Sequence, residues 1–134
     1  MASLLDTSVI VRYLTGEPPR LAARAARIID GPRLLAVTDV VIAETAFVLT
    51  SVYGIPRRTV VDGLIDLLQK HNLGVLRLDK GAVLQGLLLC RPSNRVSFAD
   101  AMVWSAARSA RAEAIYSFDE RFPRDGVQVY ADLP

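Results

Sequence analysis

Short apolar runs alternate along the chain with longer segments whose apolar residues recur at helical spacing. The first run, Ser3 to Leu5, ends at Asp6-Thr7-Ser8, a sequence that can cap a helix. Short continuous apolar runs bounded by such residues are typical of buried strands. The predicted strands are residues 3–5, 34–37, 75–78, 114–117 and 127–130.

The longer segments predict helices whose ends are marked by capping residues, Gly or Pro. Pro18 and Pro19 open the second of these segments, and Gly54 and Pro56 close the third. Asp79 stands where it can cap the fifth. The predicted helices are residues 9–16, residues 20–30, a helix capped by Thr38 or Asp39 that runs through Val52, and residues 57–72, 82–89 and 97–111.

This alternation of strands and helices predicts an α/β fold in one domain over residues 1–134. Right-handed crossovers between parallel strands place helices on both faces, so we expect a mostly parallel central sheet in an α/β/α arrangement. In such sheets the functional crevice lies beyond the carboxyl ends of the strands. Asp6 follows the first predicted strand, and Asp119 follows the fourth.

Composition narrows the kinds of site that the chain can carry. The 134 residues are 51% hydrophobic and 22% charged, which is ordinary for a globular domain. The formal net charge of +2 permits an anionic partner without requiring one. With Cys90 as the only cysteine and His71 as the only histidine, an intramolecular disulfide and a zinc site are excluded, so oxygen atoms must hold any metal. With no signal peptide and no membrane-spanning run in the sequence, we expect a cytoplasmic protein.

Four carboxylates stand at positions that hydrophobic patterning alone does not explain. Glu44 falls in the middle of an apolar helix without Lys or Arg one turn away, so a buried Glu44 would lack a local ion-pair partner. Its alternative is a place on a narrow solvent-facing stripe of the helix. Each of the others has a structural alternative. Asp6 could cap the first helix, Asp100 could complete a capping box with Ser97, and Asp119 could hydrogen-bond its own turn.

The four acids are more informative together than singly. Two stand at strand ends and two on neighbouring apolar helices, so all four could converge at one end of the sheet. Acids gathered without bases repel one another, and a divalent cation would remove that repulsion. Mg²⁺ and Mn²⁺ prefer oxygen ligands of this kind.

In these residues the chain resembles the PIN-domain ribonucleases, particularly the VapC toxins of bacterial toxin–antitoxin systems. The match covers essentially the whole chain. Its motifs are Asp6-Thr7-Ser8, Glu44, Asp100-Ala101 and Ser117-Phe118-Asp119-x-x-Phe122.

The resemblance implies a metal-dependent endoribonuclease that cleaves RNA with metal-activated water. Asp6, Glu44 and Asp100 would coordinate or position Mg²⁺ or Mn²⁺, and Asp119 would complete the site or orient the water. Ser8 and Ser117 match small polar positions beside the acids, although many members of the family carry Asn where Ser8 stands.

Three further residues are candidates for contact with RNA, each with a plain alternative. Arg91 and Arg95 precede the helix that carries Asp100 and could hold phosphates, or could simply lie in a solvated loop. Trp104, one turn beyond Asp100, could stack on a base, but an aromatic at helical spacing is more often part of the core.

The resemblance also implies protein partners: a VapB-type antitoxin that neutralises the chain, and a second copy in a homodimer. Apolar helices such as residues 57–72 offer docking surfaces, unless they are buried in the core.

Two other functions stay open. A haloacid-dehalogenase-type phosphohydrolase would need a second Asp where Ser8 stands, and a PIN-like scaffold that binds RNA or protein without catalysis would not need four intact acids.

Overall fold

The sheet is parallel throughout and lies at the centre of the molecule. The structure, a computed structural model, describes residues 2–134. Five strands pair in the order β3-β2-β1-β4-β5. They are β1 (Ser3–Leu5), β2 (Leu35–Thr38), β3 (Leu73–Leu76), β4 (Ile115–Tyr116) and β5 (Val129–Tyr130).

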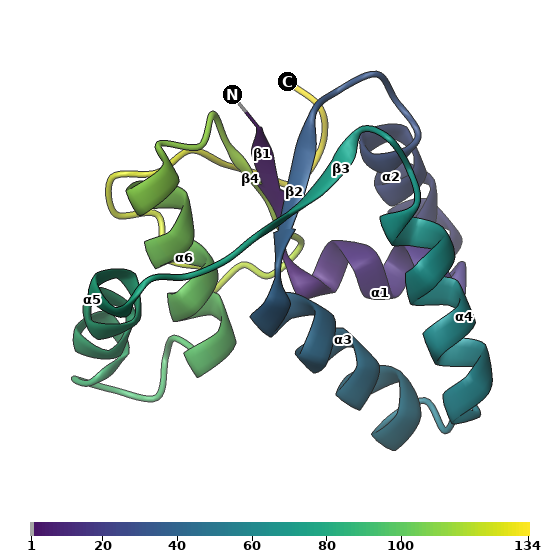
Figure 1. Cartoon of the computed structure of the whole chain (residues 1–134), viewed down its shortest axis with the longest axis horizontal. Coiled ribbons are helices and arrows are strands. Elements are labelled where there is room, and N and C mark those ends of the chain that lie inside the picture. The colour runs from purple at the N-terminus through teal and green to yellow at the C-terminus, as the bar shows by residue number, and fades with distance from the viewer. Residues whose placement is uncertain (1) are drawn as a thin grey trace.

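Helices cover both faces of this sheet, as the sequence predicts. They are α1 (Thr7–Thr15), α2 (Pro19–Ile29), α3 (Asp39–Ser51), α4 (Arg57–Leu68), α5 (Lys80–Cys90) and α6 (Phe98–Ala110). Figure 1 shows α1 to α4 on one side of the strands and α5 with α6 on the other. The α/β/α prediction is therefore confirmed.

The strand order places a topological switch point between β1 and β4. The chain adds β2 and then β3 on one side of β1, and returns through α5 and α6 to add β4 on the other side. Because successive crossovers leave the central strand in opposite directions, a crevice opens at the carboxyl ends of β1 and β4. In Figure 1 this is the lower end of the sheet, where α1, α3 and α6 begin.

Buried apolar side chains from the sheet and the helices form the core. Leu5 of β1, Ile10 of α1 and Val37 of β2 are fully buried in it. Burial of each such side chain contributes about 1.5–3 kcal/mol of transfer free energy. A smaller cluster joins Val11 of α1 to Leu49 of α3 and to α4, which fixes these helices to one another near the crevice.

Side-chain caps at three helices match the predicted starts. Thr38, not Asp39, caps α3 by accepting a hydrogen bond from the Val41 amide at 3.1 Å. Asp79 caps α5 through the Ala82 amide at 2.8 Å. Ser97 caps α6 through the Asp100 amide at 3.0 Å.

The prediction for α4 and β3 is wrong in its bounds. α4 ends at Leu68 rather than at residue 72, and β3 starts at Leu73 rather than at residue 75. Gly74, which falls between the predicted helix and the predicted strand, lies inside β3 opposite Ala36 of β2. Asn72 makes the turn instead, because its side-chain amide donates to three backbone carbonyls of the α2–β2 connection, at 3.0–3.3 Å.

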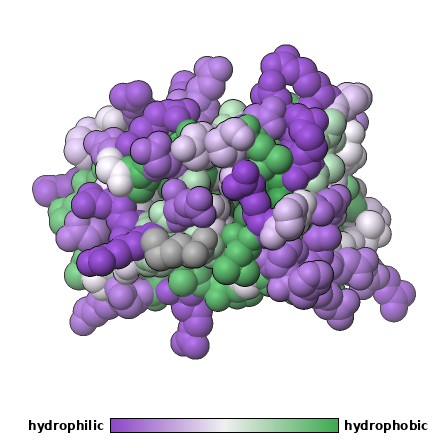
Figure 2. All heavy atoms as spheres, turned by 90° about the horizontal axis from the view of Figure 1, so that it is seen from above, coloured by the Kyte–Doolittle hydropathy of each residue, from purple (hydrophilic) through white to green (hydrophobic). Residues whose placement is uncertain are grey.

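Figure 2 shows one end of the molecule, the end that lies opposite the crevice. The end opposite the crevice, seen from above in Figure 2, carries mainly hydrophilic side chains. Within residues 2–134, none of the helices has the length and hydropathy needed to cross a membrane.

Candidate active site

Asp6 is almost completely buried at the carboxyl end of β1, with only 2% of its surface exposed. It occupies the N-cap position of α1, but its side chain makes no capping hydrogen bond, so the capping alternative is wrong. Instead its Oδ2 accepts hydrogen bonds from Ser117 Oγ at 2.7 Å and from Ser8 Oγ at 3.0 Å. Its Oδ1 is buried and has no hydrogen-bond partner among residues 2–134.

Ser8 and Ser117 also connect α1 to the loop after β4. Ser8 Oγ accepts a hydrogen bond from the Phe118 amide at 2.9 Å, and Ser117 Oγ accepts one from the Asp119 amide at 3.1 Å. Each hydroxyl therefore donates to Asp6 and accepts from the loop that carries Asp119. This network fixes the position of Asp6 relative to Asp119.

Asp100 lies in the first turn of α6 and is 6% exposed. Its backbone amide, rather than its carboxylate, takes part in the cap with Ser97. The side chain is left to face the other acids. Burial, first, and then the negative charge of Asp6 and a hydrogen bond with Asp119 raise the pKa of Asp100 to about 9.

Asp119 and Glu44 are more exposed than the other two acids. Asp119 Oδ1 accepts a hydrogen bond from the Arg121 amide at 2.8 Å, which confirms the turn alternative, yet its carboxylate also reaches Asp100. Glu44 is partly exposed on α3. It shares one helical face with Val48 and Val52, four and eight residues on, and all three side chains line the open crevice.

All four acids line a single open pocket of about 380 Å³ at the switch point. Asp6 comes from the end of β1, Glu44 from α3, Asp100 from α6, and Asp119 from the loop after β4. Four segments far apart in the sequence thus bring their carboxylates to one place. The four acids therefore converge at one end of the sheet, as the sequence predicts.

The donor set of this pocket fits a hard divalent cation. All four acidic side chains offer oxygen, and the orphaned Oδ1 of Asp6 is a buried acceptor without a donor. Burial raises the pKa of Asp6, although hydrogen bonds from Ser117 and Ser8 lower it. Across residues 2–134 no three acidic, histidine or cysteine side chains stand close enough to form a preassembled ligand cage. Mg²⁺ usually keeps several of its waters and needs only one or two carboxylates, so such an open arrangement suits it.

The pocket also holds two polar side chains that the sequence did not single out. Arg12 of α1 and Tyr53, which follows α3, line the same pocket as the acids, and Arg12 Nη1 donates to the Tyr53 hydroxyl at 3.1 Å. The spacing of Ser8 and Arg12, four residues apart on one helix, was the signal available for Arg12. Nothing in the pattern around Tyr53 indicates its position.

The three predicted RNA-contact residues lie elsewhere. Trp104 is 5% exposed, and its Nε1 donates to the backbone carbonyl of Asp125 at 2.8 Å, so the core alternative describes it. The guanidinium of Arg108 lies over its ring, 5.1 Å from the ring centre. Arg91 and Arg95 are exposed in the loop before α6 and do not line the acidic pocket.

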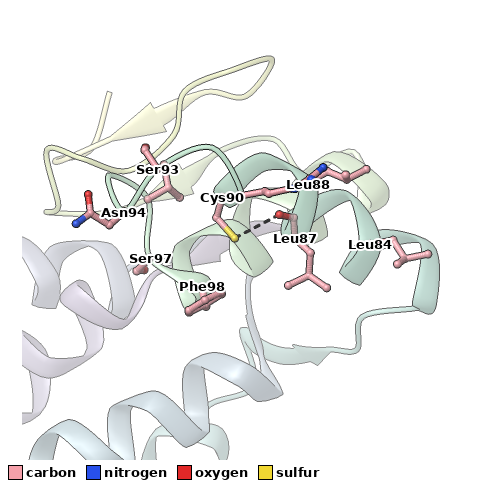
Figure 3. A pocket seen from close by; sticks show the side chains of 10 residues that line it. Leu84, Leu87, Leu88, Cys90, Ser93, Asn94, Ser97 and Phe98 are labelled. Atoms are coloured by element: carbon pink, nitrogen blue, oxygen red, sulfur yellow. Dashed lines mark hydrogen bonds between the residues drawn. The ribbon is translucent and has the colours of Figure 1, made fainter.

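A second, apolar pocket of about 700 Å³ lies between α5 and the start of α6. In Figure 3 the side chains of Leu84, Leu87 and Leu88 extend along α5, and Phe98 stands at the start of α6. Phe98 is 74% exposed, although it is a large apolar side chain. The buried Cys90 donates a hydrogen bond from its thiol to the Leu87 carbonyl at 3.6 Å.

Solved structures of toxins share this fold. VapC20 of Mycobacterium tuberculosis, a toxin that cleaves the sarcin-ricin loop, matches with a TM-score of 0.76 and 23% identity, over 94% of this chain and 96% of its own. A toxin–antitoxin complex from Klebsiella pneumoniae matches with a TM-score of 0.70 and 13% identity, over 96% of each chain. VapBC2 from Rickettsia felis, bound to a DNA fragment from its promoter, matches with a TM-score of 0.70 and 14% identity, over 97% and 98%.

Sequence comparison identifies the family. No curated protein sequence gives a significant match. The model of the PIN domain, however, matches residues 3–126, which include the four strands β1 to β4, all six helices and all four pocket acids. The chain therefore belongs to the PIN domain family.

Proposed function

We propose that this protein is a metal-dependent endoribonuclease, acting as the toxin of a type II toxin–antitoxin module. The observation that carries the proposal is the convergence of Asp6, Glu44, Asp100 and Asp119 in one pocket at the switch point of the sheet. Membership of the PIN family and the shared fold with sarcin-ricin-loop-cleaving VapC20 support it. An RNA substrate would place its action in the cytoplasm.

The chain's own residues would divide the work of phosphodiester hydrolysis. Asp6, Glu44 and Asp100 would hold Mg²⁺ or Mn²⁺, directly or through water. Ser8 and Ser117 would keep the Asp6 carboxylate in one orientation through their hydrogen bonds to Oδ2. When bound, the cation supplies activation of water and stabilisation of charge on the phosphoryl group.

Asp119 would orient the attacking water. Its Oδ1 is occupied by the Arg121 amide, which fixes the plane of the carboxylate and leaves the other oxygen for the pocket. Asp119 is partly exposed and so reachable by solvent, whereas only 2% of the Asp6 surface is exposed. A protein nucleophile is not required in this scheme.

The apolar surfaces would serve the antitoxin and a second copy of the chain. Exposed Leu88 and Phe98 border the apolar pocket, and Val61 and Ile65 of α4 are also half-exposed. Large exposed apolar areas of this kind commonly mark protein interfaces. Two of the structures that share the fold come from toxin–antitoxin assemblies.

Of the other functions left open by the sequence, one keeps a specific observation in its favour. For the PIN-like scaffold, this observation is that no three acidic, histidine or cysteine side chains among residues 2–134 stand close enough to form a preassembled ligand cage. The phosphohydrolase has no such support, because Ser8 stands in place of its second Asp and is engaged with Asp6.

Expression of the chain in bacteria without an antitoxin tests the toxin proposal. Wild-type protein should arrest growth and produce cleaved RNA in the cells, whereas Asp6→Asn should do neither. Asp66→Asn, which removes an exposed carboxylate of α4, is the matched control and should still arrest growth. Normal growth with soluble wild-type protein would contradict the toxin proposal.

A further inference from the structure

We propose that Arg12, positioned by Tyr53, binds a backbone phosphate of the RNA next to the bond that is cut. The Arg12 end of the acidic pocket would then be a nucleotide-binding subsite. This inference rests on the proposed nuclease function and adds to it a residue that contacts the substrate.

Within residues 2–134, Arg12 is the only basic residue that lines the pocket. On α1 it follows Ser8 by four residues and Val11 by one, and these three side chains share the face of the helix that borders the pocket. A guanidinium is thus built into the same cavity as four carboxylates. The question is what this guanidinium binds in a cavity of carboxylates.

Arg12 does not neutralise the pocket acids in this structure. Ion pairs within residues 2–134 join Arg24 and Arg27 to Asp132, and Lys70 to Asp30, but none involves Arg12. Its Nη1 donates instead to two neutral acceptors, the Tyr53 hydroxyl at 3.1 Å and the Glu17 carbonyl at 3.4 Å. The positive charge of Arg12 is therefore available to an anion from outside the chain.

The hydroxyl of Tyr53 positions the Arg12 guanidinium, and Tyr53 is itself held by packing and by a backbone hydrogen bond. The Tyr53 ring packs against the small cluster of Val11, Leu49 and α4, and its amide donates to the Val48 carbonyl at 3.2 Å. A guanidinium that is held before the ligand arrives loses less conformational entropy on binding. Arginine has five N–H donors in a planar fork, so two bonds from Nη1 leave others for a phosphate.

The surroundings of Arg12 suit a nucleotide rather than a free anion. Val48, Val52 and Tyr53 form an apolar wall on this side of the pocket, and Val52 is 73% exposed. Bases of single-stranded RNA pack on such apolar and aromatic surfaces, while their phosphates need a cation. Without the Arg12 guanidinium, the four carboxylates of the pocket would repel the RNA backbone.

Binding of a short, fluorescein-labelled, single-stranded RNA of randomised sequence tests this assignment. The titration uses the antitoxin-free protein with Ca²⁺ in place of Mg²⁺, gel electrophoresis to show that the RNA stays intact, and salt from about 50 to about 200 mM. Arg12→Ala should weaken binding about tenfold, because a charge-assisted hydrogen bond is lost. It should also lower the slope of log Kd against log salt by about 0.7, the value for one phosphate contact on a single strand.

Three matched variants separate this role from a general effect of charge. Arg20→Ala removes an exposed arginine of α2 and should leave RNA affinity unchanged. Arg12→Lys should keep the salt slope but recover only part of the affinity, because lysine lacks the planar fork. Tyr53→Phe should raise KM for cleavage with kcat unchanged, as expected of a positioning residue.

The outcomes distinguish this inference from the proposed nuclease function. If Arg12→Ala binds RNA like the wild type, the subsite is wrong while the nuclease stands. If Arg12→Ala instead weakens Mn²⁺ binding, measured by calorimetry, with RNA affinity intact, Arg12 serves the metal site and the inference is also overturned. If wild-type protein neither binds nor cleaves RNA, both proposals fail.

Discussion

Ser117 donates a hydrogen bond of 2.7 Å from its hydroxyl to Oδ2 of Asp6, a residue 111 positions earlier in the chain. This contact joins the ends of the neighbouring strands β1 and β4. Together with the hydrogen bond from Ser8 of α1, it holds the acid by side chains from two segments that lie far apart in the sequence.

Ser117→Ala should loosen the metal site without unfolding the protein. Asp6 would lose the shorter of its two hydroxyl donors while staying buried, at a cost of about 1.5–3 kcal/mol of unfolding free energy. Affinity for Mn²⁺ should fall about tenfold, as is typical when a group that orients a ligand is removed. Denaturant unfolding and calorimetry measure the two effects, with Ser93→Ala, an exposed serine, as the control. Unchanged Mn²⁺ affinity in Ser117→Ala would contradict the positioning role.

Asp100→Asn should stabilise the metal-free protein. The raised pKa of Asp100, from 3.8 to about 9, means that the folded state binds more protons than the unfolded state between these values. Stability from this group is therefore lost as pH rises. Asn carries no charge, so the variant should melt above the wild type at about pH 8, by about 3–5 °C for each kcal/mol gained.

The difference between Asp100→Asn and wild type should shrink toward about pH 5, because the free energy that the unfolded state gains by ionising the Asp100 carboxyl decreases as pH approaches 3.8. Thermal melts at both pH values, in EDTA, provide the measurement. A difference that grows on acidification would show that the charge of Asp100 is not the cause.

The sequence predicts the chemistry of the pocket better than its boundaries. The four acids could be found because strands and helices have distinct hydrophobic spacing, and because acids after buried strands must gather where parallel strands end. The role of Asp6 could not be settled in this way. An N-cap and a buried ligand occupy the same position in a sequence, and only the contacts of Ser8 and Ser117 distinguish them.

Two failures have tertiary causes. Gly74 reads as a turn residue, but pairing with Ala36 of β2 takes it into the strand. From the sequence, Trp104 is a candidate for stacking on a base, although an aromatic at helical spacing is more often core, and its core position depends on the carbonyl of Asp125, 21 residues away in sequence. Arg12 lies four residues after Ser8 and so shares its helical face, but this spacing alone does not show that the face borders a pocket.

Trp104→Phe should separate stability from activity. The change removes the hydrogen bond to the Asp125 carbonyl and part of a buried side chain, so the free energy of unfolding should fall by about 1–3 kcal/mol. The rate of RNA cleavage below the melting temperature should stay within about twofold of the wild type, because the ring does not line the acidic pocket. A selective rise in KM at unchanged stability would restore the stacking role.

A divalent cation should stabilise the wild-type protein by binding the folded state alone. At a Mn²⁺ concentration of about 100 times Kd, the gain is about 2.7 kcal/mol. Glu44→Gln should reduce this gain, whereas Asp66→Asn should leave it intact, since Asp66 lies exposed on α4. Melting curves in Mn²⁺ and in EDTA give the comparison, and equal gains in Glu44→Gln and the wild type would remove Glu44 from the site.

Cleavage of a panel of structured RNAs by the purified, antitoxin-free protein tests the central claim most directly. Wild type, Asp100→Asn and Asp66→Asn are compared in Mg²⁺, in Mn²⁺ and in EDTA. We expect the wild type and Asp66→Asn to cut RNA with either metal and not in EDTA, and folded Asp100→Asn to cut none. Cleavage that persists in EDTA, or in Asp100→Asn at the wild-type rate, would contradict a cation-dependent site built from these acids.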